Sequence, residues 1–179
     1  MSMEYEIEYE KELESALKLF GMGIKTKQGM TEIELAEKEQ LYGMFFPPEL
    51  RLLYMNAVPV AKGFYDWTDD SPENIWYIKK MIEHPIKSTI FDVENCNCWM
   101  DEWGEKPEDF HTRQKILMER LRAAPKLIPI HEHYFIPEAG PCDTGNPVFD
   151  FIQLCEAHCQ AETLWLFFER YFKHRQKDD

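Results

Sequence analysis

Hydrophobic residues recur at helical spacing along one face of residues 107–124. The residues of that face are Phe110, Leu117, Leu121 and Ala124. Positions three, four and seven apart share a helical face, so this spacing predicts a helix. Pro125 follows directly and cannot continue the helix, which places its end there.

Both ends of the sequence are expected to be helical. Residues 161–175 carry aromatic and aliphatic residues at helical spacing, and acidic residues among the basic ones argue against a helix lying on a membrane. The residues expected to be buried are Leu164, Phe168 and Phe172. Glu at every second position of residues 4–14 is typical of a strand, but residues 13–20 return to helical spacing. We therefore expect a core-docked C-terminal helix and a helix within residues 1–30 whose start the pattern does not fix.

Three further helices are indicated by the residues at their ends. A capping box at the start and a glycine at the end predict a helix over residues 32–42. The residues of this pattern are Thr31, Glu34 and Gly43. Pro48 and Pro72 are each followed directly by a glutamate, and proline and acidic side chains are both preferred in a first helical turn. We expect helices to begin at these two prolines.

Segments rich in β-branched and aromatic residues predict three strands, over residues 88–95, 127–136 and 146–153. Helices and strands alternate irregularly, which indicates the α+β class. The sequence has no long linker or repeat. We therefore expect residues 1–179 to form a single domain, a mixed but mostly antiparallel sheet packed with several helices.

The sequence has 20 basic and 33 acidic residues, a formal net charge of −13. Phosphate groups repel such a surface, so neither nucleic acid nor an anionic membrane is an expected partner. A basic protein would be attracted and its association accelerated. The charge could equally serve solubility alone.

The sequence starts without a cationic and apolar signal, and no apolar run is long enough to cross a bilayer. We therefore expect a cytoplasmic protein. Its cysteines are odd in number and are expected to be reduced thiols without a bridge. They are Cys96, Cys98, Cys142, Cys155 and Cys159.

In a continuous strand over residues 127–136, His131 and His133 would lie on the same face. Two histidines on one face could both bind a metal ion. A zinc site needs three or four ligands at definite spacing, and no such motif completes the set. No motif for a nucleophile or a phosphate loop occurs either. We therefore expect no metal, no cofactor and no catalytic residue, and a metal-dependent enzyme is the least favoured of three functions.

Four motifs in order resemble one known family. They are "TEIELAEKEQLYGMFFPPELRLLY", "EWGEKP" shortly after Trp99, "LIPIHEHYFIP" and "GNPVF". The sequence is similar over about residues 31–152 to the Smi/Knr family of the SUKH superfamily. It differs where members often have Gly-His-Arg-Tyr, at residues 132–135, and where they have proline, at Asp101.

The resemblance implies a SUKH-like fold and a non-catalytic protein-binding function. Bacterial relatives are largely regarded as immunity proteins that neutralise toxins, often nucleases, and the acidic charge favours this function because a nuclease binds phosphate in a basic cleft. Fungal relatives regulate cell-wall synthesis, so a regulatory or scaffold protein is the alternative.

Two stretches combine acidic residues with aromatic residues, a mixture that suits tight contact with a basic protein. The candidate contact residues are Tyr65, Trp67, Asp69, Asp70, Trp99, Asp101, Glu102 and Trp103. Solvated loops are the competing interpretation for the aspartates, and core packing is the competing interpretation for Trp99 and Trp103.

Overall fold

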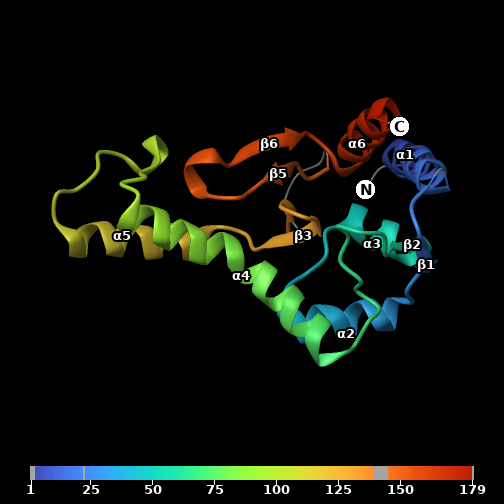
Figure 1. Cartoon of the computed structure of the whole chain (residues 1–179), viewed down its shortest axis with the longest axis horizontal. Helices are drawn as coiled ribbons and strands as arrows, with labels where there is room; N and C mark the ends of the chain where they lie inside the picture. Colours follow the sequence, from blue (N-terminus) through green and yellow to red (C-terminus); the bar gives the residue numbers. More distant parts are fainter. Residues whose placement is uncertain (1–2, 22, 139–144, 179) are drawn as a thin grey trace.

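The computed structural model of the chain describes residues 3–21, 23–138 and 145–178. Its helices are α1 (Met3–Gly21), α2 (Glu32–Tyr42), α3 (Pro48–Asn56), α4 (Pro72–Asn95), α5 (Phe110–Ala123) and α6 (Leu164–Asp178), with short 3-10 turns η1 (Asp101–Trp103) and η2 (Leu154–Glu156). The molecule is elongated, with α1 and α6 together near one end and the loop between α4 and α5 at the other (Figure 1).

The strands form two antiparallel sheets. A small sheet pairs β1 (Thr26–Gln28) with β2 (Ala57–Pro59). A larger sheet has the order β3–β4–β5–β6, built from β3 (Leu127–His131), β4 (Tyr134–Pro137), β5 (Val148–Asp150) and β6 (His158–Ala161). This arrangement of helices and antiparallel strands confirms the predicted α+β class.

The helix predictions from end residues are confirmed. The amide of Thr31 donates to the Glu34 carboxylate at 2.7 Å, and the amide of Glu34 donates to the Thr31 hydroxyl at 3.2 Å, which completes the capping box of α2. Gly43 ends that helix in the left-handed region, at φ 62°. Helices α3 and α4 begin at Pro48 and Pro72, as predicted.

The strand predicted over residues 88–95 was wrong, because these residues form the last turns of α4, which runs through Pro85. The buried residues of α4 are spaced three or four apart over most of its length: Ile78, Ile82, Pro85, Thr89, Asp92 and Val93. Burial of that helical face outweighs the β propensity of the segment.

The single strand predicted over residues 127–136 was also wrong. Residues 127–137 form a hairpin of β3 and β4, turning at Glu132, whose φ is +46°. His131 therefore ends one strand and is buried, whereas His133 lies in the turn. The two histidines do not share the face of one strand.

The cysteines contradict the prediction of reduced thiols, because Cys98 and Cys155 form a disulfide. The end of α4 and the turn η2 meet, which brings the two α-carbons to 6.2 Å, within the usual range for a bridge. Cys96 and Cys159 are free and exposed. Cys142 lies outside the described residues.

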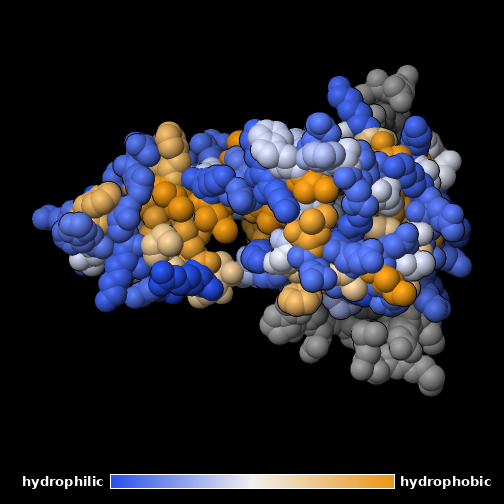
Figure 2. All heavy atoms as spheres, turned by 90° about the horizontal axis from the view of Figure 1, so that it is seen from below, coloured by the Kyte–Doolittle hydropathy of each residue, from blue (hydrophilic) through white to orange (hydrophobic). Residues whose placement is uncertain are grey.

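The core consists of two adjoining clusters of buried residues. The larger includes Tyr54, Trp67 and Phe168 and lies among α1, α2, α3, α6 and the strands. The smaller joins α4, α5, β4 and η2 around Leu117 and Phe135. Figure 2 shows the surface from below, where hydrophobic residues reach the surface in several places among hydrophilic ones. Among the described residues, no helix is both long and apolar enough to span a membrane.

The C-terminal helix is docked in the core, as expected from its apolar stripe. Leu164 and Phe168 are buried, and Phe168 packs edge-on against Phe20 of α1 with ring centroids 5.0 Å apart. The side chain of Phe172 lies outside the described residues. Helix α1 begins at Met3, so the strand-like stretch at residues 4–14 is helical.

Candidate protein-binding site

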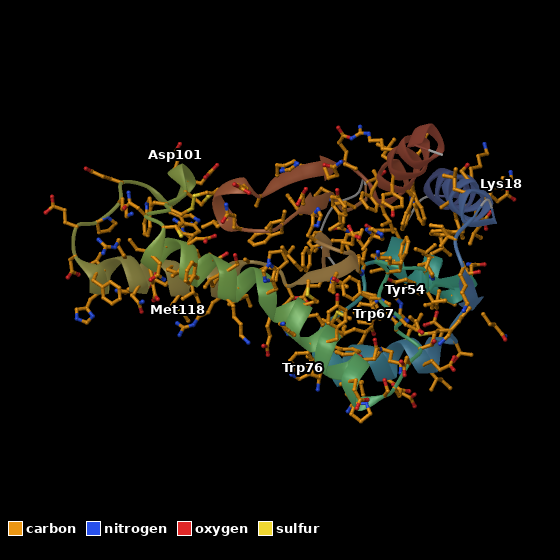
Figure 3. The ribbon with its side chains drawn as sticks, viewed as in Figure 1. Lys18, Tyr54, Trp67, Trp76, Asp101 and Met118 are labelled. Carbon is orange, nitrogen blue, oxygen red and sulfur yellow. A yellow bond between two sulfur atoms is a disulfide. The ribbon has the colours of Figure 1, made fainter. Side chains whose placement is uncertain are left out.

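The predicted contact residues are not brought together by the fold. Residues 65–70 lie before α4, whereas residues 99–103 follow it, at opposite ends of a 24-residue helix. Figure 3 shows Trp67 beside Tyr54 within the body and Asp101 at the far end of the molecule. The two stretches therefore cannot form one contact surface.

Tyr65 and Trp67 are core residues, so the prediction that they anchor a partner is corrected. Trp67 is 1% exposed and packs edge-on against Tyr42 and Phe46, with centroids 5.3 and 5.0 Å away. The Tyr65 hydroxyl donates to the carbonyl of Glu132 at 2.5 Å. Their large apolar area makes burial favourable even in a stretch rich in aspartate.

The aspartates of this stretch serve local structure. Asp69 accepts a hydrogen bond from the amide of Ser71 at 2.9 Å, directly before α4. Asp70 forms an ion pair with Lys38 of α2, and the lysine side chain is almost fully buried. Both carboxylates thus hold the loop in place, although Asp70 itself remains exposed.

The second stretch forms a protruding segment, residues 99–110, that we call the acidic tip (Figure 1). Trp99 and Trp103 are half-buried and meet edge-on, with centroids 5.2 Å apart. The Trp99 indole N–H donates to the carbonyl of Gly104 at 2.9 Å, and Gly104 has φ +87° as the turn requires. The tryptophan pair therefore fixes the shape of the tip and exposes part of each ring.

The tip concentrates negative charge. Its exposed acidic residues are Asp101, Glu102, Glu105, Glu108 and Asp109. Asp109 caps α5 by accepting from the amide of Thr112 at 2.7 Å, and hydrogen bonds from Thr112 lower the pKa of its carboxyl. The other four form no ion pair within the described part of the chain. Phe110, 48% exposed, adds an apolar ring beside these charges.

A groove of about 620 Å³ lies between α4, α5, the β3–β4 hairpin and η2. Its apolar lining includes Ile82, Ile86, Leu121, Leu127 and Phe151, and Trp103 of the acidic tip contributes to the wall. Figure 2 shows a hollow bordered by hydrophobic residues on this side of the molecule. The volume is in the range of ligand-binding clefts.

Four contacts hold residues 152–155, beside the lining residues Phe151 and Leu154, against α4 and the residues that follow it. The carbonyl of Ile152 accepts from the hydroxyl of Ser88 at 3.3 Å and lies 3.1 Å from the imidazole of His84. The buried carboxylate of Asp92 accepts from the amide of Leu154 at 2.7 Å. The Cys98–Cys155 disulfide adds a covalent link directly beside it. The groove is therefore a preformed feature of the fold.

The histidines of the hairpin have structural partners. The His131 imidazole lies 2.9 Å from the hydroxyl of Tyr171. His133 Nε2 lies 3.6 Å from the carboxylate of Asp150. Among the described residues, no group of three or more histidine, cysteine or acidic side chains is placed to hold a metal ion.

A buried link that the sequence did not reveal joins two of the motifs. Glu49, from "FFPPEL", accepts hydrogen bonds from the backbone amide and the side-chain amide of Asn146, each at 2.8 Å. Asn146 belongs to "GNPVF", and the preceding Gly145 has φ +86°, a value that favours glycine. The two motifs form one buried polar contact.

The chain matches no protein-family model, no curated protein and no solved structure. The resemblance to the Smi/Knr family therefore stays a prediction from the sequence.

Proposed function

We propose that the chain is a non-catalytic protein-binding module whose acidic tip contacts a basic protein. The observation that carries this proposal is the tip itself. It combines four exposed acidic side chains, which form no ion pair within the described residues, with the paired rings of Trp99 and Trp103 and the exposed ring of Phe110. Aromatic rings supply contact area that loses water on binding, and carboxylates supply charge complementarity.

The best candidate for the partner is a toxin domain, with the chain as its immunity protein. The toxins that such immunity proteins neutralise are often nucleases. The Smi/Knr resemblance supports this assignment, and the net charge of −13 fits a partner with a basic phosphate-binding cleft. The contact between Glu49 and Asn146 supports the resemblance indirectly, because it gives a structural reason why these two motifs occur together.

The alternative is a regulatory or scaffold protein of the same family. Both functions use a binding surface and no catalytic residue. A toxin gene directly upstream supports the immunity function, and its absence supports regulation.

The expected compartment is the cytoplasm, where a disulfide is unusual and is often a transient redox link. Thiol trapping in intact cells, followed by mass analysis, measures the state of Cys98 and Cys155 at the site of action. Under this proposal the pair is found at least partly as thiols. Complete oxidation in the native cell would place the protein in an oxidising compartment and contradict a cytoplasmic function.

The binding proposal is tested by the association rate with the candidate toxin domain. Asp101→Lys with Glu102→Lys should slow association several-fold, and the wild-type rate should fall steeply between low and physiological salt, where screening shortens electrostatic reach to about 8 Å. Both side chains are exposed and form no ion pair within the described residues, so the fold should persist.

The matched control is Glu10→Lys with Glu37→Lys, which makes the same change in net charge at exposed residues of α1 and α2. The control should slow association less than the tip variant does. Equal rates for the wild type and the tip variant would remove the tip from the proposed interface. The pair Asp69 and Asp70 is less suitable, because both carboxylates hold their own loop.

A further inference from the structure

The rim of the groove carries the opposite charge to the rest of the chain. Arg120 and Arg122 in the last turn of α5 and Lys126 just before β3 line it, with Glu138 as the one acidic residue of the described lining. The described lining thus has a formal charge of +2, from three cations and one carboxylate, within a chain of −13. The carboxylate of Glu138 accepts from the amides of Lys126 and Phe45, at 3.2 and 3.3 Å.

The fold uses these three cations in different ways, but pairs none of them with a carboxylate among the described residues. By comparison, Arg51 contacts two glutamates. A helix C-terminus favours the two arginines through its dipole. Lys126 lies outside α5, and its ammonium has a structural partner in the carbonyl of Gly43, the residue that ends α2.

The floor of the groove is apolar and is exposed to solvent at its edge. Ile86 is 42% exposed at its edge, and Leu121, Leu127 and Phe151 lie deeper. Binding is favourable when apolar side chains of a ligand replace water on such a surface. The lining therefore matches a ligand with one apolar and one acidic face.

We propose that this groove binds an acidic amphipathic helix of a protein partner. Apolar residues at spacings of three and four would enter the floor, and carboxylates along one flank would reach Arg120, Arg122 and Lys126. From Arg120 to Lys126 the backbone of the rim extends at most about 15 Å, or nearly three helical turns. Three separate cations over that length favour several carboxylates over a single acid group.

The inference goes beyond the proposed function, because the acidic tip attracts basic proteins and the groove attracts acidic ones. Trp103 belongs to both, so the two surfaces are neighbours. Only the groove variants described below test this inference, and only the tip variants test the proposed function. Failure of one experiment therefore leaves the other proposal standing.

The probe is a labelled amphipathic peptide of about 15 residues, long enough to form a marginal helix, with leucines on one face and glutamates on its flank. Fluorescence anisotropy should show saturable binding to the wild-type protein. The same peptide with lysine in place of glutamate should bind about tenfold more weakly, because the rim would repel it. Equal affinity for both peptides would overturn the proposal.

The decisive variant is Arg120→Glu with Arg122→Glu, which should weaken binding of the glutamate peptide about tenfold. Lys79→Glu with Lys115→Glu makes the same change in net charge at exposed residues outside the groove lining and should weaken it much less. Ile86→Glu, at the exposed edge of the floor, should also weaken binding. If the arginine and lysine variants lose equal affinity for the glutamate peptide, the effect comes from net charge alone. That result would overturn the proposed binding site.

Dodecanoate separates a peptide site from a site for a small amphiphilic acid. It should not displace the bound peptide at concentrations below its micelle threshold. Binding of dodecanoate without binding of the peptide would assign the groove to small acids and overturn the proposal. Every substituted side chain is exposed, so all variants should fold. The arginine variant should melt slightly below the wild type, because glutamates are unfavourable in the last turn of α5, and binding is measured well below that temperature.

Discussion

Gly63 shows how a single residue without a side chain fixes its surroundings. Its φ of +93° lies in a region that other residues rarely adopt, and an added Cβ would lie 2.9 Å from Cε1 of the His131 ring and nearer still to Nε2. Its carbonyl accepts the amide of Glu132 at 2.8 Å, at the turn of the hairpin. The position therefore requires glycine for two independent reasons.

Gly63→Ala should lower the free energy of unfolding by about 1 to 3 kcal/mol, because it adds backbone strain and a clash with His131. Urea unfolding measures this change. Gly21→Ala is the control, since an added Cβ meets nothing within 4 Å there and its φ is not positive. Equal stability of the two variants would show that the hairpin moves aside freely.

Glu49 is a second residue whose chemistry is fixed by its surroundings. Glu49→Ala leaves the two donors of Asn146 without their buried acceptor, so we expect a loss of about 2 to 4 kcal/mol in the free energy of unfolding. Glu49→Gln keeps an acceptor oxygen and should lose less. Similar losses for alanine and glutamine would mean that the charge, and not the hydrogen bonds, matters at this site.

At the scale of elements, the sequence predicts best where a local pattern closes a helix. The capping box and Gly43 bound α2 correctly, because those interactions lie within a few residues of one another. The C-terminal half of α4 was mistaken for a strand, since its β-branched and aromatic composition does not show which face other elements will bury. The hairpin was missed because its turn contains neither glycine nor proline.

The disulfide is an element-scale constraint that joins the end of α4 to η2. Cys155→Ser should lower the free energy of unfolding by about 2 to 4 kcal/mol, because the bridge restricts the unfolded chain over 57 residues. Urea unfolding of the wild type with reductant should reproduce the variant. Cys159→Ser, at a free and exposed cysteine, should leave stability unchanged. If reductant has no effect on the wild type, the bridge contributes nothing to folding.

At the scale of the molecule, the acidic tip was found partly from the sequence and the groove was not. Trp99 and Trp103 with Asp101 and Glu102 are neighbours in sequence, so their pattern could be read directly. The groove draws its lining from residues between 82 and 154, which only the packing of four elements brings together. Trp67 was wrongly predicted to be a contact residue, because aromatic residues among aspartates are typical of a surface loop. In the structure, α2 and α3 cover its ring.

Alkaline pH should destabilise the whole fold through its buried tyrosines. Burial, with Asp70 and Asp69 adding repulsion, raises the pKa of Tyr42 to about 12, and burial also raises the pKa of Tyr54 and Tyr65. The unfolded state loses these protons near pH 10, before the folded state does. Stability is therefore complete below about pH 10 and falls as pH rises through 12.

Tyr42→Phe should lose less stability than the wild type between about pH 10 and 12, by up to about 2 kcal/mol. Urea midpoints across that interval measure the difference. Identical pH dependence in both proteins would show that Tyr42 keeps an ordinary pKa in the fold.

The disulfide also determines how the molecule responds to force. When the chain is pulled at its two ends, the 57-residue span between Cys98 and Cys155 bears no load while the bridge is intact. An oxidised molecule should therefore lengthen about 200 Å less on forced unfolding than a reduced one. Helix α5 and strands β3, β4 and β5 lie within this span, so they would lose their neighbours without being stretched themselves. A single pulling trace would thus report whether the bridge is closed.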